Sequence, residues 1–156
     1  MPPSLKNGLN NLQIEDMLKD IHNYGGVYSK DEIPKNLKKN YWYVVNMQNE
    51  KDGNGTHWIC FKYNSTIIYW DSFGFPPPKE IMKLSKKGLL YSTKEIQNIK
   101  STSCGWFCIA IIRLDALDND KLTPKGHYQK IINKFSDDST ENEQLLYNLL
   151  KQVGVQ

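Results

Sequence analysis

The 156-residue sequence has few cysteines, a single arginine and little net charge. Three cysteines, Cys60, Cys104 and Cys108, are too few for a disulfide framework, and an odd number cannot all pair. We therefore expect free thiols in a reducing compartment. Because Arg113 is the only arginine beside 19 lysines, a site built from several bidentate arginine forks is not expected. A formal charge of +3 argues against a dedicated nucleic-acid-binding protein.

Long hydrophobic runs are also missing. No stretch approaches the roughly 18 apolar residues that a membrane span needs, and residues 1–8 lack the pattern of a signal peptide. We therefore expect neither membrane insertion nor secretion. Hydrophobic residues still make up 39% of the chain, which excludes disorder caused by low hydrophobicity. No repeat or shift in composition divides the chain, so one domain over residues 1–156 is expected.

The hydrophobic pattern predicts a helix, then strands, then mainly helices. Asn10 or Asn11 is the expected cap of the first helix, and Gly25-Gly26 is expected to end that region. Polar or proline-rich loops are expected over residues 49–56, 72–78 and 93–103. The predicted strands cover residues 41–47, 57–63, 66–71 and 89–92, the middle two forming a hairpin, and the predicted helices cover 9–21, 79–87, 104–117, 123–135 and a final segment capped by Ser139 or Thr140. This order is typical of an α+β domain.

Four polar residues stand near the ends of these elements. His57 begins a strand in GTHWICF, and Asp71 ends the next one in YWDSFGF. If the two strands pair as a hairpin, both residues lie at the same end of the sheet. Cys104 begins the buried helix in STSCGWFC, and Gln97 lies seven residues before it. An imidazole, a carboxylate, a thiol and an amide are the groups that cysteine-based acyl transfer requires.

Each group has a chemical role in such a reaction. A helix N-terminus favours the thiolate of Cys104, and His57 can accept the thiol proton and later protonate the leaving amine. Asp71 would hydrogen-bond the other ring nitrogen of the histidine. Gln97 and the backbone N–H of Cys104 would stabilise the tetrahedral oxyanion. Gly105 would leave the backbone beside the nucleophile open to the substrate.

Each residue alone also has a plainer structural interpretation. A single cysteine at the start of an apolar helix is usually a small buried hydrophobic residue, and we assign Cys60 and Cys108 to that class. The spacing between Cys104 and Cys108, without further ligands nearby, does not predict a metal site. The remaining histidines, His22 and His127, are expected on solvent-exposed helix surfaces.

Taken together, three strings are much more specific. GTHWICF, YWDSFGF and QNIKSTSCGWFC resemble the adenovirus-type maturation proteases, or adenains, and related Ulp1-like cysteine proteases. In that family a His-Trp pair follows a glycine-containing loop, an acidic residue precedes a small-Phe-Gly-Phe turn, and a glutamine lies seven residues before a Cys-Gly pair. The later string NEQLLYNLL resembles the C-terminal helix of the family, so the resemblance spans residues 41–150.

The resemblance implies a fold, a site and a substrate. The fold would be a central mixed β-sheet packed against the buried helix that carries the nucleophile. His57 would be the general base, Asp71 its orienting acid, Cys104 the nucleophile and Gln97 the oxyanion donor. The protein would be a monomeric viral endopeptidase that needs no metal or cofactor. It would cut capsid or virion precursor proteins near Gly-Gly or Gly-X-Gly sites, through a narrow cleft walled by Trp58, in the virion or in the cytoplasm or viral factory of an infected cell.

Two features depart from adenain. The acid is Asp71 rather than glutamate, and no cysteine lies between it and Cys104, which argues against the disulfide-linked activating peptide of that family. The small, lysine- and asparagine-rich chain suggests a virophage, a Polinton-like element or a large DNA virus. Activation by DNA or by a peptide stays open, and six lysines form either a solvated surface or a non-specific DNA contact: Lys79, Lys83, Lys86, Lys87, Lys94 and Lys100.

Two other functions remain open. A Ulp1-like isopeptidase that removes ubiquitin or SUMO-type modifiers would use the same residues, although the lack of long insertions for docking a folded modifier favours the endopeptidase. A catalytically inactive, peptide-binding scaffold is the second alternative. The presence of all four candidate site residues argues against it.

Overall fold

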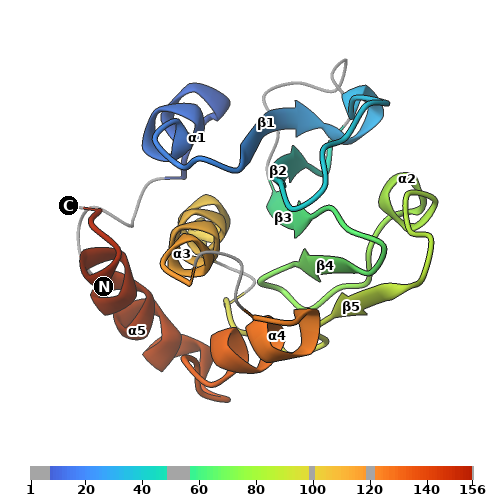
Figure 1. Ribbon diagram of the computed structural model, residues 1–156. Coiled ribbons are helices and arrows are strands. Elements are labelled where there is room, and N and C mark those ends of the chain that lie inside the picture. Colours follow the sequence, from blue (N-terminus) through green and yellow to red (C-terminus); the bar gives the residue numbers. More distant parts are fainter. Residues whose placement is uncertain (1–7, 49–56, 99–100, 119–121, 156) are drawn as a thin grey trace.

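The computed structural model describes residues 8–48, 57–98, 101–118 and 122–155, and it has the mixed α+β architecture expected from the sequence (Figure 1). The strands lie in a single five-stranded sheet, in the order β1-β2-β3-β4-β5. The elements are α1 (Asn11–Leu18), β1 (Tyr24–Ser29), the 3-10 helix η2 (Lys30–Glu32), β2 (Trp42–Asn46), β3 (Trp58–Lys62), β4 (Ile67–Trp70), α2 (Lys79–Met82), β5 (Leu89–Tyr91), α3 (Cys104–Ala116), α4 (Pro124–Ile132) and α5 (Ser139–Gln152).

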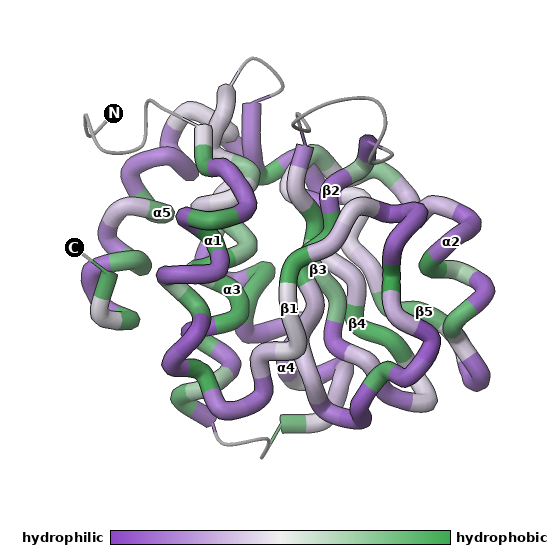
Figure 2. The backbone as a smooth tube through the Cα atoms, turned by 90° about the horizontal axis from the view of Figure 1, so that it is seen from above, coloured by the Kyte–Doolittle hydropathy of each residue, from purple (hydrophilic) through white to green (hydrophobic). Residues whose placement is uncertain are grey.

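The three central strands are buried along their whole length. β2, β3 and β4 are antiparallel neighbours, whereas β1 and β5 run parallel to β2 and β4 at the two edges. Because side chains alternate between the faces of a strand, Val44 and Cys60 pack on the side of α3, and Val45 and Phe61 pack on the opposite side with Ile81 of α2. Figure 2 shows the sheet with α1, α3 and α5 on one side and α2 on the other. The β3–β4 hairpin predicted from the sequence is confirmed.

The helix α3 lies at the centre of the helical layer, between the sheet and helices α1 and α5 (Figure 1). Eleven of its 13 residues are buried, which explains the apolar pattern of this segment. No helix in the described ranges is long and apolar enough to cross a membrane. The first residue of α3 is Cys104, so the most buried helix of the fold carries the candidate nucleophile at its N-terminus.

Several expected boundaries differ from the structure. Gly25 lies inside β1 rather than ending the first helical region. A glycine is required there because a Cβ would lie 2.3 Å from the ring of Tyr43 on the neighbouring strand. The predicted helix over residues 79–87 is confined to α2, and the helix α5 is capped by the side chain of Asp138 rather than by Ser139 or Thr140. The caps Asn10 and Thr123 are confirmed. The predicted loop over residues 49–56 lies outside the described residues.

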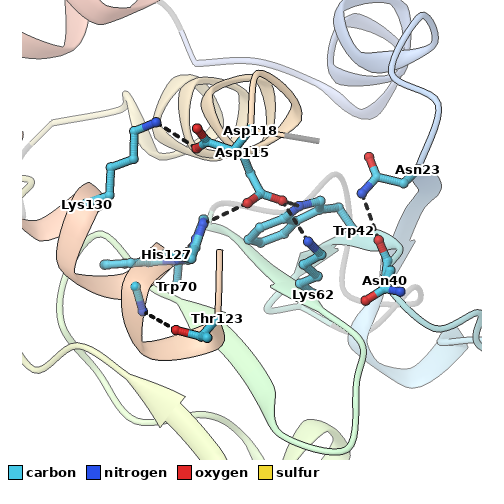
Figure 3. A network of polar contacts seen from close by, with 11 residues as sticks. Asn23, Asn40, Trp42, Lys62, Trp70, Asp115, Asp118, Thr123, His127 and Lys130 are labelled. Carbon is cyan, nitrogen blue, oxygen red and sulfur yellow. Dashed lines mark hydrogen bonds and ion pairs between the residues drawn. The ribbon is translucent and has the colours of Figure 1, made fainter. Parts of the chain in front are cut away.

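His127 is buried rather than exposed, because α4 packs its side chain between two tryptophans. The indole of Trp70 donates to its Nε2 (3.1 Å), and its Nδ1 lies 3.0 Å from Oδ1 of Asp115. The other oxygen of Asp115 accepts from Trp42 (2.8 Å) and from Lys62 (3.0 Å). These five residues form the Asp115 network (Figure 3). It joins β2, β3 and β4 to α3 and α4, a role that the polar sequence around His127 did not reveal.

Candidate active site

The hairpin brings His57 and Asp71 together, as the sequence predicted. One residue precedes β3 and the other follows β4, and in an antiparallel pair these two positions lie at the same end of the sheet. Nε2 of His57 lies 2.8 Å from Oδ1 of Asp71, whose side chain is only 1% exposed. The same carboxylate oxygen accepts the backbone N–H of Phe73 at 2.8 Å, which fixes its orientation. The pair is therefore preorganised by the turn that follows β4.

One aromatic ring supports the imidazole on one face. The ring of Phe73 stacks on His57 with centroids 4.3 Å apart and an interplanar angle of 15°. Phe75 packs edge-on against Phe73 and is half exposed. The SFGF string thus supplies both the backbone donor to Asp71 and the ring that supports the histidine.

Cys104 lies beside this pair. Its Sγ accepts the backbone N–H of Trp58 at 3.4 Å, and the residue is 4% exposed. With Nε2 of His57 engaged by Asp71, the nitrogen left for the thiol is Nδ1, which has no close hydrogen-bond partner in the described part of the chain. Burial of the ring opposes its protonation. The hydrogen bond with Asp71 and the interaction with Cys104 outweigh burial and raise the pKa of His57 to about 9.

Gln97 is buried and held on both sides of its amide. The hydroxyl of Ser72, the residue after Asp71, donates to Oε1, and Nε2 donates to the backbone carbonyl of Ser101 at 3.0 Å. The backbone N–H of Gln97 also donates to the carbonyl of Ser72, at 2.9 Å. A carboxamide nitrogen carries two hydrogens, so within the described part of the chain one stays available for an acceptor such as an oxyanion. Gln97 is thus fixed between the segment after Asp71 and the loop that leads into α3.

Two expectations about the surroundings of the nucleophile are wrong. A Cβ on Gly105 would lie 3.3 Å from Leu9 and 3.4 Å from Trp58, so the space beside the glycine is filled by the protein rather than left for substrate. Trp58 is 5% exposed and donates its indole N–H to the carbonyl of Leu9 at 2.9 Å. Its ring therefore packs beneath the N-terminal segment instead of walling a cleft. The sequence around Leu9 carries no signal for this contact.

Comparison with solved structures identifies the fold. The crystal structure of ASFV pS273R protease aligns with 99% of this chain and 70% of that chain, with a TM-score of 0.60 and 14% sequence identity. The two proteins therefore share a fold. The central domain of the uncharacterised Lpg1148 protein from Legionella pneumophila also aligns, with a TM-score of 0.51, 9% identity and coverage of 94% and 96% of the two chains. No protein-family model matches the sequence, and neither does any curated protein.

The other two cysteines have the environment of structural residues. Cys60 and Cys108 are free and buried. Burial, with a hydrogen bond to Cys60, raises the pKa of the Cys108 thiol well above its usual value. Within the described ranges, no group of three or more His, Cys, Asp or Glu side chains is arranged to hold a metal ion.

The candidate DNA-binding lysines are only partly grouped in the structure. Four of them are exposed on α2 and in the segment that follows it: Lys79, Lys83, Lys86 and Lys87. Lys94 instead pairs with Asp137 at 3.1 Å, and Lys100 lies outside the described residues. DNA contact at this surface stays a prediction.

Proposed function

We propose that the protein is a cysteine endopeptidase in which Cys104 is the nucleophile, His57 the general base, Asp71 its orienting acid and Gln97 an oxyanion donor. One observation carries the proposal: an imidazole held by a carboxylate at 2.8 Å lies next to a thiol at a helix N-terminus. The fold shared with a protease supports the same reaction class.

The electrostatics favour an ion pair between the thiol and the imidazole. A raised pKa near 9 means that His57 readily holds a proton at neutral pH. The positive end of the 13-residue α3 dipole lies at Cys104, where it favours a thiolate. Proton transfer from the Cys104 sulfur to Nδ1 of His57 therefore generates the nucleophile before the substrate reacts.

The reaction then follows in two stages. The sulfur of Cys104 attacks the carbonyl carbon of the scissile peptide bond, and the oxyanion accepts hydrogen bonds from the Gln97 amide and from the backbone N–H of Cys104. His57 gives its proton to the leaving amine, and a thioester remains. A water molecule loses a proton to His57 and attacks the thioester, which releases the acid and restores the thiol.

The substrates we propose are viral capsid or virion precursors, cut near Gly-Gly or Gly-X-Gly sites during maturation. The motif resemblance supports this choice, and so does the burial of the nucleophile. Since Cys104 is only 4% exposed and lies beside the His57–Phe73 stack, a substrate with glycines at the scissile bond approaches the sulfur most easily.

The test is cleavage-site mapping. A peptide library that contains Gly-Gly and Gly-X-Gly sequences is incubated with the wild-type protein and with Cys104→Ala, and the products are identified by mass spectrometry. We expect cuts at glycine-containing sites by the wild type alone. Equal cutting by both proteins would refute the assignment of the nucleophile. Ubiquitin and SUMO conjugates are assayed in parallel, and a strong preference for them over peptides would favour the isopeptidase.

A further inference from the structure

A buried glutamate from the C-terminal helix reaches the loop before the nucleophile. Glu143 of α5 is 8% exposed, and its Oε1 accepts two hydroxyl groups. Ser101 donates to it at 2.6 Å and Ser103 at 2.8 Å. The two serine oxygens lie 2.7 Å from each other, so the three side chains form one closed cluster. A residue about 40 positions away in the sequence thus fixes the segment that leads into Cys104.

This cluster changes the start of α3. Ser103 is the N-cap residue, a position where a serine oxygen usually accepts a backbone N–H of the first turn. Here the Ser103 side chain makes no capping hydrogen bond, and its hydroxyl instead donates to Glu143. The backbone N–H groups around Cys104 are consequently not occupied by their own cap, which suits a turn that must receive an oxyanion.

The same cluster is connected to Gln97. The backbone carbonyl of Ser101 accepts Nε2 of Gln97 at 3.0 Å, and the hydroxyl of the same serine is held by Glu143. Displacement of Ser101 would therefore turn the amide of Gln97 as well. Both candidate oxyanion donors, the Gln97 amide and the first turn of α3, depend on the position of this short loop.

We infer that Glu143 is a positioning residue of the oxyanion site, which it orders through Ser101 and Ser103; the inference rests on the proposed function. Stability alone does not favour this residue. Its second oxygen, Oε2, is buried without a hydrogen-bond partner in the described part of the chain, and an unsatisfied buried acceptor is costly. An unfavourable buried group of this kind is typical of positions where the residue orders a functional site.

The test uses variants of Glu143 and a matched control. Glu143→Ala removes both serine contacts, whereas Glu143→Gln keeps an acceptor oxygen of the same reach. The control is Asn142→Ala, because the neighbouring Asn142 is also buried, while its side chain bonds, within the described residues, to the backbone of Ser136 alone, at 2.7 and 2.9 Å. All proteins are assayed with a fluorogenic peptide that ends in Gly-Gly, and their thermal unfolding is measured.

We expect Glu143→Ala to lower kcat about 10- to 100-fold, as misplaced catalytic groups do, with KM changed by less than about twofold. Glu143→Gln should recover most of the loss, and Asn142→Ala should keep the kcat of the folded protein. Combined with Gln97→Ala, the effect of Glu143→Ala should be less than additive, because part of its loss comes from displacing the same amide that Gln97→Ala removes. The rate at which iodoacetamide alkylates Cys104 should be retained in Glu143→Ala.

The outcomes separate the two claims. If the wild type neither cleaves the peptide nor labels selectively at Cys104, the proposed function fails. If the wild type is active but Glu143→Ala has normal kcat, or if its effect is fully additive to that of Gln97→Ala, the positioning role is refuted. If Glu143→Ala does not fold, Ser101→Ala and Ser103→Ala test the same contacts, and normal kcat in both would overturn the inference.

Discussion

Two histidine–aspartate pairs lie at opposite ends of α3. His57 and Asp71 are 2.8 Å apart beside Cys104, the first residue of the helix. His127 pairs at 3.0 Å with Asp115, in the last turn of the same helix, about 16 Å away along its axis. The two pairs have similar nitrogen–oxygen distances, yet only one of them has the surroundings of a catalytic site.

The difference lies in the second ring nitrogen. An indole N–H can only donate, so the bond from Trp70 makes Nε2 of His127 an acceptor and leaves its proton on Nδ1, facing Asp115. Both nitrogens of His127 are thus used within the protein. Nδ1 of His57 is instead left for Cys104. A histidine–aspartate pair becomes a candidate base only where one nitrogen stays free beside a nucleophile.

The two carboxylates differ in the same way. Burial opposes ionisation of Asp115, but the hydrogen bond with His127, the bond from Trp42 and the charge of Lys62 outweigh it and hold the pKa of this carboxyl well below its usual value. With donors from three elements, Asp115 serves the packing of the fold. Asp71 accepts from one ring and one backbone N–H, and it serves to orient that ring.

The largest effect should come from the nucleophile itself. Cys104→Ala should abolish peptide cleavage, because no other thiol borders His57, and it should leave the midpoint of thermal unfolding nearly unchanged. Cleavage assays and calorimetry on the same preparation check both parts. Residual cleavage at the same sites would mean that the His57 end of α3 is not the active end.

Removal of the oxyanion donor should have the next largest effect. Gln97→Ala should lower kcat by roughly 10²- to 10³-fold while KM changes little, since the lost hydrogen bond forms in the transition state. Steady-state kinetics with the fluorogenic peptide measure both constants. A raised KM with normal kcat would show instead that Gln97 binds the ground state.

Asp71→Asn should sharpen the contrast through its pH dependence. Without the carboxylate, the pKa of His57 should fall from about 9, so the alkaline limit of activity should move to lower pH and kcat/KM should drop by roughly tenfold or more.

The raised pKa of His57 also stabilises the fold. That contribution is complete below the ordinary pKa of about 6.5 and is lost as the pH rises through about 9. Unfolding curves of the wild type and Asp71→Asn over this range should converge at high pH, and parallel curves would contradict the account.

Asp115→Asn should lower the stability of the fold and have the smallest effect on catalysis of these variants. Lys62 would lose its buried carboxylate partner, which typically costs about 3–5 kcal/mol of folding free energy. Denaturant unfolding should show this loss, whereas kcat of the folded protein should equal that of the wild type. A large fall in kcat without a fall in stability would mean that the two ends of α3 are not functionally separate.

The candidate site could be located from the sequence because its residues mark the ends of elements. His57 and Asp71 flank a hairpin whose strands have a continuous apolar pattern, and Cys104 begins the most apolar helix. Such local apolar patterns predict where strands and helices begin and end, and therefore where these residues lie. The burial of His127 and Glu143 could not be predicted, since both lie in polar strings typical of exposed helix surfaces. Their partners lie on elements remote in the sequence, so only tertiary packing brings them inside.

The most direct test of the central claim is the rate at which each cysteine is alkylated. The three thiols are all nearly buried, with exposures of 0%, 4% and 3% for Cys60, Cys104 and Cys108, so accessibility alone does not distinguish them. Iodoacetamide labelling at neutral pH, followed by peptide mass spectrometry, should modify Cys104 at least roughly tenfold faster than the other two, and His57→Ala should remove this advantage. Equal labelling of the three cysteines, or fast labelling of Cys104 that is independent of His57, would contradict the account.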